Sequence, residues 1–143
     1  MQKIRLIYAS DATEGLVYRD FATLMERASE ANRLLGVTGM LCHGGGKFLQ
    51  VLEGERTVVS ALYHHIIVDP RHSNCTLMLV EDTETRDFSE WSMKVIDWDD
   101  GITRRSARGR SGTQLFEPYA LSGPAALQFF RALAADEREL LEG

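Results

Sequence analysis

Residues 37–55 read VTGMLCHGGGKFLQVLEGE, which is two apolar segments joined by three glycines. The apolar segments favour strands and the glycines are typical of a tight turn, so the stretch predicts a β-hairpin. One residue does not suit a buried strand, because Gln50 lies on the same face as Phe48 and Leu52. Burying an amide without hydrogen-bond partners costs about 1–3 kcal/mol. The hairpin therefore predicts a polar partner that faces Gln50.

Strand and helix patterns alternate on both sides of the hairpin. Residues 3–10, KIRLIYAS, alternate with the period of a strand. Apolar residues then recur every three or four positions over 18–35, which predicts an amphipathic helix that ends at Gly36. A second helix is expected to begin with Thr57 as its cap and to stop before Pro70.

Two more strands are predicted at 74–82 and 91–98, separated by a charged loop around Arg86. The order βαββαββ is typical of a ferredoxin-like α+β fold, with a mixed five-stranded sheet and two helices on one face. The predicted organisation is one domain over 1–98, followed over 99–143 by a linker and a C-terminal helical extension.

The extension contains an arginine-bearing linker and a helix. Residues 99–113 hold four arginines among Gly and Ser, which indicates an exposed segment. A helix should start at Ser122-Gly123-Pro124, since Pro suits a first turn. Its apolar stripe includes Leu127, Phe130, Leu133, Ala134 and Leu141. We expect this helix to cover the second face of the sheet, within one chain or across a dimer.

Composition limits the classes of partner. The chain has 143 residues, the length of one ordinary domain, and a net charge of −5, which argues against nucleic acid. No apolar run approaches the roughly 20 residues that cross a bilayer, so no membrane partner is expected. The first ten residues become polar too soon for a secretory signal, which favours the cytoplasm. No His or Cys set has the spacing of a metal site.

Three polar residues lie on faces that are otherwise apolar. Tyr8 shares a strand face with Ile4 and Leu6, and Asn32 lies on the apolar side of the first helix. Each of these, like Gln50, could find a local partner by itself. Together they indicate a polar, planar ligand between the helices and the sheet.

Five stretches of the chain, in order and covering roughly residues 3–97, carry a family resemblance. They are LIYAS at 6–10, SEANRLLGVTGML at 29–41, FLQVLEGE at 48–55, DPRH at 69–72 and RDFSEWSM at 86–93. With them the chain resembles a BLUF domain, a blue-light sensor that uses FAD, and the remainder resembles the extension of short, stand-alone members. FMN and riboflavin stay open as alternative cofactors.

The resemblance implies a role for each matching residue. Tyr8 would be the photoactive tyrosine beside the flavin ring, and Gln50 would lie between Tyr8 and the flavin edge. Asn32 would bond the pyrimidine end of the ring and Leu24 would pack on it. The residues Asp69, Arg71 and His72 would line the region near the ribityl chain. Trp91 and Met93 would relay the signal, as neighbours on one strand face with Val95.

The same resemblance implies a sensor rather than an enzyme. Blue light makes a flavin a strong oxidant, Tyr8 can give up an electron and a proton, and the Gln50 amide can be left rotated or tautomerised. Output would pass to a separate signalling protein, through the linker or the last helix. A homodimer or larger homo-oligomer is expected.

Two other classes share features with this sequence. An RNA-recognition module has a related strand order, but its third strand should carry several aromatic residues, where this chain has only Phe48. A ferredoxin-like hydrolase could use Asp69, Arg71 or His72, but no nucleophile and base have suggestive spacing. Flavin absorbance, RNA retention and a turnover assay in the dark would separate the three.

Overall fold

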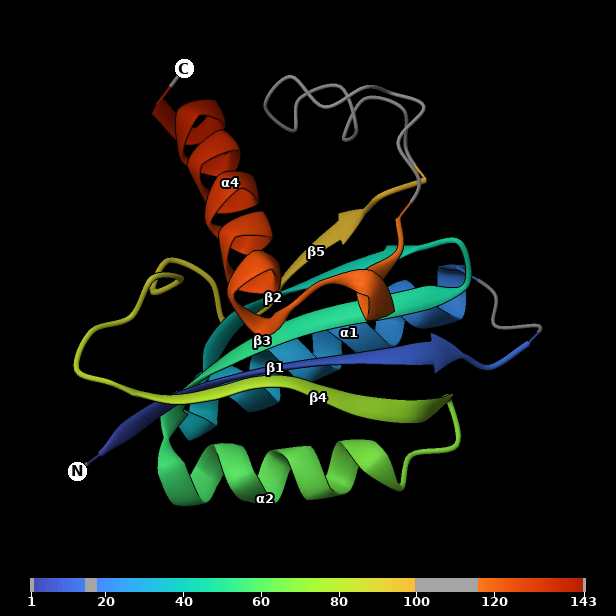
Figure 1. The fold of residues 1–143 in the computed structure, drawn as a ribbon, viewed down its shortest axis with the longest axis horizontal. Helices are drawn as coiled ribbons and strands as arrows, with labels where there is room; N and C mark the ends of the chain where they lie inside the picture. The colour runs from blue at the N-terminus through green and yellow to red at the C-terminus, as the bar shows by residue number, and fades with distance from the viewer. Residues whose placement is uncertain (1, 15–17, 100–115, 143) are drawn as a thin grey trace.

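The computed structural model describes residues 2–14, 18–99 and 116–142 (Figure 1). Its elements are β1 (Lys3–Ala12), α1 (Tyr18–Leu35), β2 (Thr38–Gly44), β3 (Lys47–Glu55), α2 (Arg56–Ile67), β4 (His72–Thr83), β5 (Lys94–Asp97), the 3₁₀ turn η1 (Pro118–Ala120) and α4 (Gly123–Glu142). The arginines of the expected linker lie outside the described residues. The predicted domain boundary at residue 98 stays a prediction.

The strands form one sheet in the order β4-β1-β3-β2-β5. Neighbouring strands are antiparallel, except that β2 and β5 run parallel, which makes the sheet mixed. Helices α1 and α2 lie on one face of the sheet and α4 lies on the other (Figure 1). The ferredoxin-like fold with a C-terminal helix is confirmed.

Two glycines form the tight turn of the β2–β3 hairpin. Gly45 and Gly46 have φ of 54° and 75°, in the left-handed region that residues with a Cβ rarely adopt. Gly39 serves a different purpose in β2, because a Cβ there would lie 1.9 Å from the carbonyl oxygen of Val51. On its other side β3 pairs with β1, and Gln50 lies directly opposite Tyr8.

The sheet buries apolar side chains on both faces. Ile7, Leu49 and Val51 pack in one cluster with Phe130 and Leu133 of α4. The expectation that the last helix covers the second face is therefore met within a single chain. Inclusion of Leu141 in the buried stripe was wrong, because this side chain is 72% exposed near the helix end.

The start of α2 differs from the prediction. Glu55, not Thr57, is the N-cap residue, and the Thr57 hydroxyl donates to the Glu55 carboxylate at 2.9 Å. Because β3 runs directly into α2, the helix begins one residue before Thr57. The helix ends at Ile67, before Pro70, as expected.

The strand predicted at 91–98 begins later than expected. β5 begins at Lys94, so Trp91 and Met93 do not lie in a strand. The Trp91 N–H bonds the Phe88 carbonyl in a turn, which removes the period of two on which the shared face depended. Trp91 packs against the cluster on the α4 side, whereas Met93 packs on the α1 and α2 side with Val95.

The first turn of α4 has a side-chain cap. The Ser122 hydroxyl accepts a hydrogen bond from the N–H of Ala125 at 3.1 Å. Ser122→Ala should therefore lower the free energy of unfolding by about 1 kcal/mol, measured by urea denaturation. Ser60→Ala is the control, since Ser60 is exposed within α2 and has no side-chain hydrogen bond among the described residues. Equal stabilities for the two variants would contradict the cap.

Candidate functional site

A cavity lies between α1, α2 and the sheet face that these helices cover. It is lined by Tyr8, Phe21, Leu24, Met25, Ala28, Asn32, Leu41, Phe48, Gln50, Leu62, Ile66, Asp69, Arg71, His72 and Met93. All seven residues expected to bind a cofactor are among them, and so is Met93. Trp91 is not, because its ring packs toward α4.

Gln50 connects two other side chains at the cavity. Its Oε1 accepts a hydrogen bond from the Tyr8 hydroxyl, and its Nε2 donates to the Met93 sulfur at 3.3 Å. Tyr8 and Gln50 are 3% and 7% exposed. One N–H of the amide has no further partner among the described residues, so it can donate to a ligand in the cavity.

The surroundings of Tyr8 keep its hydroxyl protonated. Burial, and to a smaller extent the nearby Cys75, Tyr63 and Asp69, raise the pKa of Tyr8 well above its usual value. The ring centroid of Tyr63 lies 5.4 Å from that of Tyr8. Tyr8 therefore acts as a hydrogen-bond donor to Gln50 at any ordinary pH.

Asn32 is buried near the end of α1 and holds a segment from another part of the chain. Its Nδ2 donates to the backbone carbonyl of Ser92 at 3.2 Å, and the backbone carbonyl of Asn32 accepts from the N–H of Val37. The side chain is thus an anchor for the residues that precede β5. It also lines the cavity, where its amide can meet a ligand.

His72 is held by two hydrogen bonds at the α2 end of the cavity. Its Nε2 donates to the carbonyl oxygen of Ile66, which can only accept, at 2.7 Å. Its Nδ1 lies 2.9 Å from the oxygen of the buried Ser10 hydroxyl. Nearby, the Arg71 guanidinium donates to the Asp69 carboxylate at 2.6 Å.

Several residues at the site were not predicted. The rings of Phe21 and Phe48 stack with centroids 5.3 Å apart and form an apolar wall. Met25 and Ala28 share the same helical stripe, so the period that located Asn32 could have located them. Ser10 lies two residues after Tyr8 in β1, which is the signal that could have placed it beside His72.

This arrangement suits a flat molecule with an apolar body and polar edges. Stacked phenylalanines and helix side chains offer apolar walls, while the amides of Asn32 and Gln50 offer donors and acceptors. No group of His, Cys, Asp and Glu in the described part of the chain could hold a metal ion. No helix among the described residues is long and apolar enough to cross a bilayer.

Comparison with known families identifies the molecule. The family model described as BLUF, sensors of blue-light using FAD, matches residues 4–94. The chain belongs to the BLUF family. BLUF domains are flavin-binding light sensors rather than enzymes, and this decides against the RNA-recognition and hydrolase alternatives.

Relatives of this BLUF chain have different lengths. The blue light- and temperature-regulated antirepressor BluF of Escherichia coli is 31% identical over 144 residues, which cover 96% of this chain and 34% of that protein. A photoactivated adenylate cyclase subunit beta of Euglena gracilis is 36% identical over 89 residues, or 62% of this chain. The chain spans 10% of the cyclase subunit's length.

Solved BLUF structures share the fold. The dark-state structure of BlrB aligns with a TM-score of 0.79 and 27% identity, covering 94% of this chain and 96% of that one. Klebsiella pneumoniae BlrP1, solved with FMN and cyclic diGMP, aligns with a TM-score of 0.63 and 33% identity over 67% of this chain and 26% of that one. The likeness to BlrB extends over the last helix as well as the sheet.

Proposed function

We propose that this chain senses blue light through a flavin, FAD by the habit of its family, bound in the cavity between α1, α2 and the sheet. The observation that carries the proposal is the buried hydrogen-bond chain from Tyr8 through Gln50 to Met93 at that cavity. When bound, the flavin supplies absorption of blue light and an excited state that takes up an electron.

Different cavity residues would contact different parts of the flavin. Asn32 and Gln50 offer their amides to the polar edge of the ring, and Leu24 packs against its face. Asp69, Arg71 and His72 lie at the end formed by α2 and β4, where a chain attached to the ring would leave. Of the proposed binding residues, Arg71 is the one whose positive charge suits a phosphate.

Tyr8 is suited to give up an electron and a proton reversibly. Its hydroxyl is a protonated phenol hydrogen-bonded to Gln50, so the proton has a path along this bond and can return by it. Burial excludes water, which would otherwise compete for the proton.

Gln50 is suited to be the switch because its two ends differ. In the structure its carbonyl faces Tyr8 and its NH₂ group faces the Met93 sulfur. A rotated amide would turn its carbonyl toward that sulfur, which is an acceptor and cannot donate. The bond to Met93 would be lost, and the segment before β5 would lose one of its attachments to the cavity.

Output is proposed to pass to a separate signalling protein. The relatives suggest the kinds of effector that light can control, since one is named an antirepressor and others are named adenylate cyclase subunits. We propose α4 as the contact surface, because it lies on the sheet face opposite the cavity (Figure 1). A homo-oligomer and a cytoplasmic location remain predictions.

The test is an absorption spectrum in the dark and under blue light. Purified chain, supplied separately with FAD, FMN and riboflavin, should retain flavin and turn yellow. Blue light should shift the flavin band to longer wavelength, and the shift should reverse in the dark. Retention of no flavin, or a spectrum that light does not change, would rule out the proposed function. Comparison of the three ligands identifies the cofactor.

A further inference from the structure

The last three residues of the segment from Asp87 to Met93 are bonded to the cavity residues Gln50 and Asn32 and to β2. Met93 accepts a hydrogen bond from Gln50, and the Ser92 carbonyl accepts one from Asn32. The Trp91 carbonyl accepts from the N–H of Gly39 in β2 at 3.0 Å. Any movement of this segment would therefore change contacts at the cavity.

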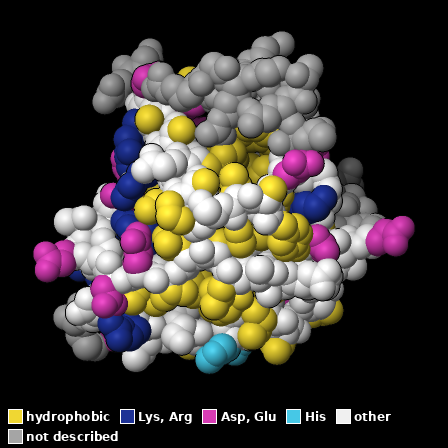
Figure 2. Space-filling model, viewed as in Figure 1, with side chains coloured by type: hydrophobic (Ala, Val, Ile, Leu, Met, Phe, Trp, Pro, Cys, Tyr) yellow, Lys and Arg dark blue, Asp and Glu magenta, His cyan; other side chains and the backbone are white. Residues whose placement is uncertain are grey.

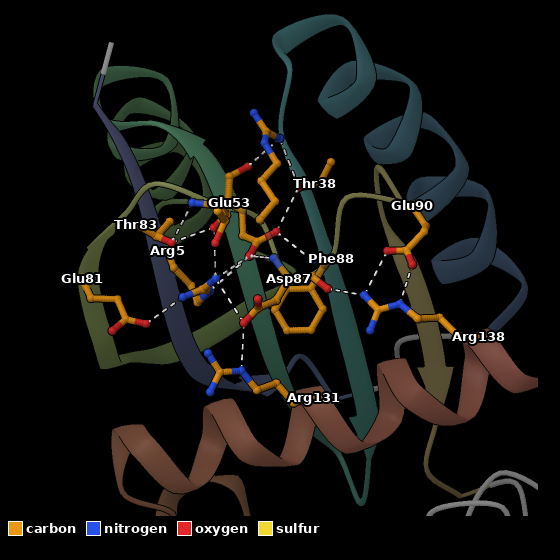
Figure 3. A network of polar contacts seen from close by, with 12 residues as sticks. Arg5, Thr38, Glu53, Glu81, Thr83, Asp87, Phe88, Glu90, Arg131 and Arg138 are labelled. Carbon is orange, nitrogen blue, oxygen red and sulfur yellow. Dashed lines mark hydrogen bonds and ion pairs between the residues drawn. The ribbon is translucent and has the colours of Figure 1, made fainter.

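Arg138 of α4 contacts three residues of the same segment. The Arg138 guanidinium bonds the Glu90 carboxylate through Nε and through Nη2, the latter at 3.0 Å, and Nη2 also donates to the Asp87 carbonyl (Figure 3). Its central carbon lies 5.4 Å from the centre of the Trp91 ring. The bond from Arg138 also lowers the pKa of Glu90, so this carboxylate is ionised at neutral pH.

The start of the segment has further partners besides Arg138. Glu53 in β3 accepts hydrogen bonds from the N–H groups of Asp87 and Phe88 at 2.8 and 3.0 Å. Arg131, two turns before Arg138, reaches the Asp87 carboxylate at 2.8 Å (Figure 3). Dark-blue Lys and Arg side chains form a column at the upper left of Figure 2, on the side of the view where α4 lies in Figure 1. Arg131 thus contacts only the start of the segment, whereas Arg138 also contacts Glu90 and Trp91, which lie closer to Met93.

We infer that Arg138 is a positioning residue for the Gln50 switch: by holding Glu90, Trp91 and the Asp87 carbonyl, it sets where the segment places Met93 against Gln50. For its effect on the light response this inference rests on the proposed function. The coupling is reciprocal. A change in the bond between Gln50 and Met93 would therefore also alter the contacts that Arg138 makes with Glu90 and Trp91.

The experiment compares Arg138→Ala with Arg131→Ala, which removes the same side chain from the same helix. The first readout is the NMR signal of the Met93 methyl group in flavin-free protein, with Met78 of β4, which packs on the other face of the sheet, as an internal reference. We expect Arg138→Ala to shift the Met93 signal and Arg131→Ala to leave it in place. Arg138→Lys keeps the positive charge but not the paired N–H groups of the guanidinium, so it should restore the signal in part.

The second readout is the dark recovery of the red shift in flavin-loaded protein. Arg138→Ala should change the recovery rate by about threefold or more, in the range found for residues that couple two sites, and Arg131→Ala should change it less. Equal effects of the two variants on both readouts would overturn the inference. If Arg138→Ala does not fold, Arg138→Lys and Arg131→Lys carry the same comparison.

The two readouts separate failure of this inference from failure of the proposed function. A wild-type chain that retains no flavin would contradict the proposed function, but the Met93 signal would still report whether Arg138 positions the segment. The opposite result is a normal red shift together with a Met93 signal that Arg138→Ala does not change. That result would support the proposed function and contradict a role for Arg138 in positioning the segment.

Discussion

Gln50→Leu protein should bind flavin and show no red shift under blue light. Leucine is similar in size to glutamine and suits the apolar walls of the cavity, so the binding site should persist. It can neither accept from the Tyr8 hydroxyl nor donate to the Met93 sulfur, and both described bonds of the amide disappear. The measurement is the light-minus-dark difference spectrum, in which the signal of the wild type should fall to baseline.

Two further variants make this result specific. Tyr8→Phe removes only the hydroxyl and should also retain flavin without the normal red shift. Phe48→Leu alters the cavity wall two residues before Gln50 in β3 but leaves the amide in place, so its red shift should survive. An intact red shift in Gln50→Leu would remove the residue from the switch.

Glu53→Ala should lower the free energy of unfolding by about 3–5 kcal/mol, because it leaves a buried charge and buried N–H groups without their partner. Glu53 is 0% exposed and forms an ion pair at 3.0 Å with Arg5, which is also buried. It also accepts the N–H bonds of Asp87 and Phe88 (Figure 3). Urea denaturation at neutral pH measures the change.

A matched control distinguishes burial from ion pairing. Glu81 also bonds Arg5, at 2.8 Å, but its side chain is 37% exposed. Glu81→Ala should therefore cost about 1 kcal/mol or less. Glu53→Gln, which keeps the shape and one acceptor oxygen, should fall between the two alanine variants. A Glu53→Ala protein as stable as Glu81→Ala would contradict this account of the network.

Periodicity predicted the cavity-facing residues that lie within regular elements. The period of two in β1 and β3 placed Tyr8 and Gln50 on one face, and the helical period placed Asn32 on the same side of the sheet. These positions follow from backbone geometry, which each local sequence determines. That the three serve a flavin came from the family resemblance, since polar residues on an apolar face have many possible partners.

Residues outside the strands and helices could not be placed in this way. The period of two failed for Trp91 and Met93 because tertiary bonds, from Glu53, Gly39 and Asn32, determine the path of their segment. The contact of Arg138 with Glu90 joins residues 48 positions apart. The burial of Arg5 depends on Glu53 and three further groups that no local pattern reveals.

The cover that α4 provides has a consequence for protein engineering. Ile7, Leu49 and Val51 would be exposed to water in a fusion that kept the sheet and discarded α4. Such a chimera would present a broad apolar surface, which favours aggregation. A light-controlled fusion built from this domain should therefore retain residues through α4, or supply an amphipathic helix with aromatic side chains in the positions of Phe129 and Phe130.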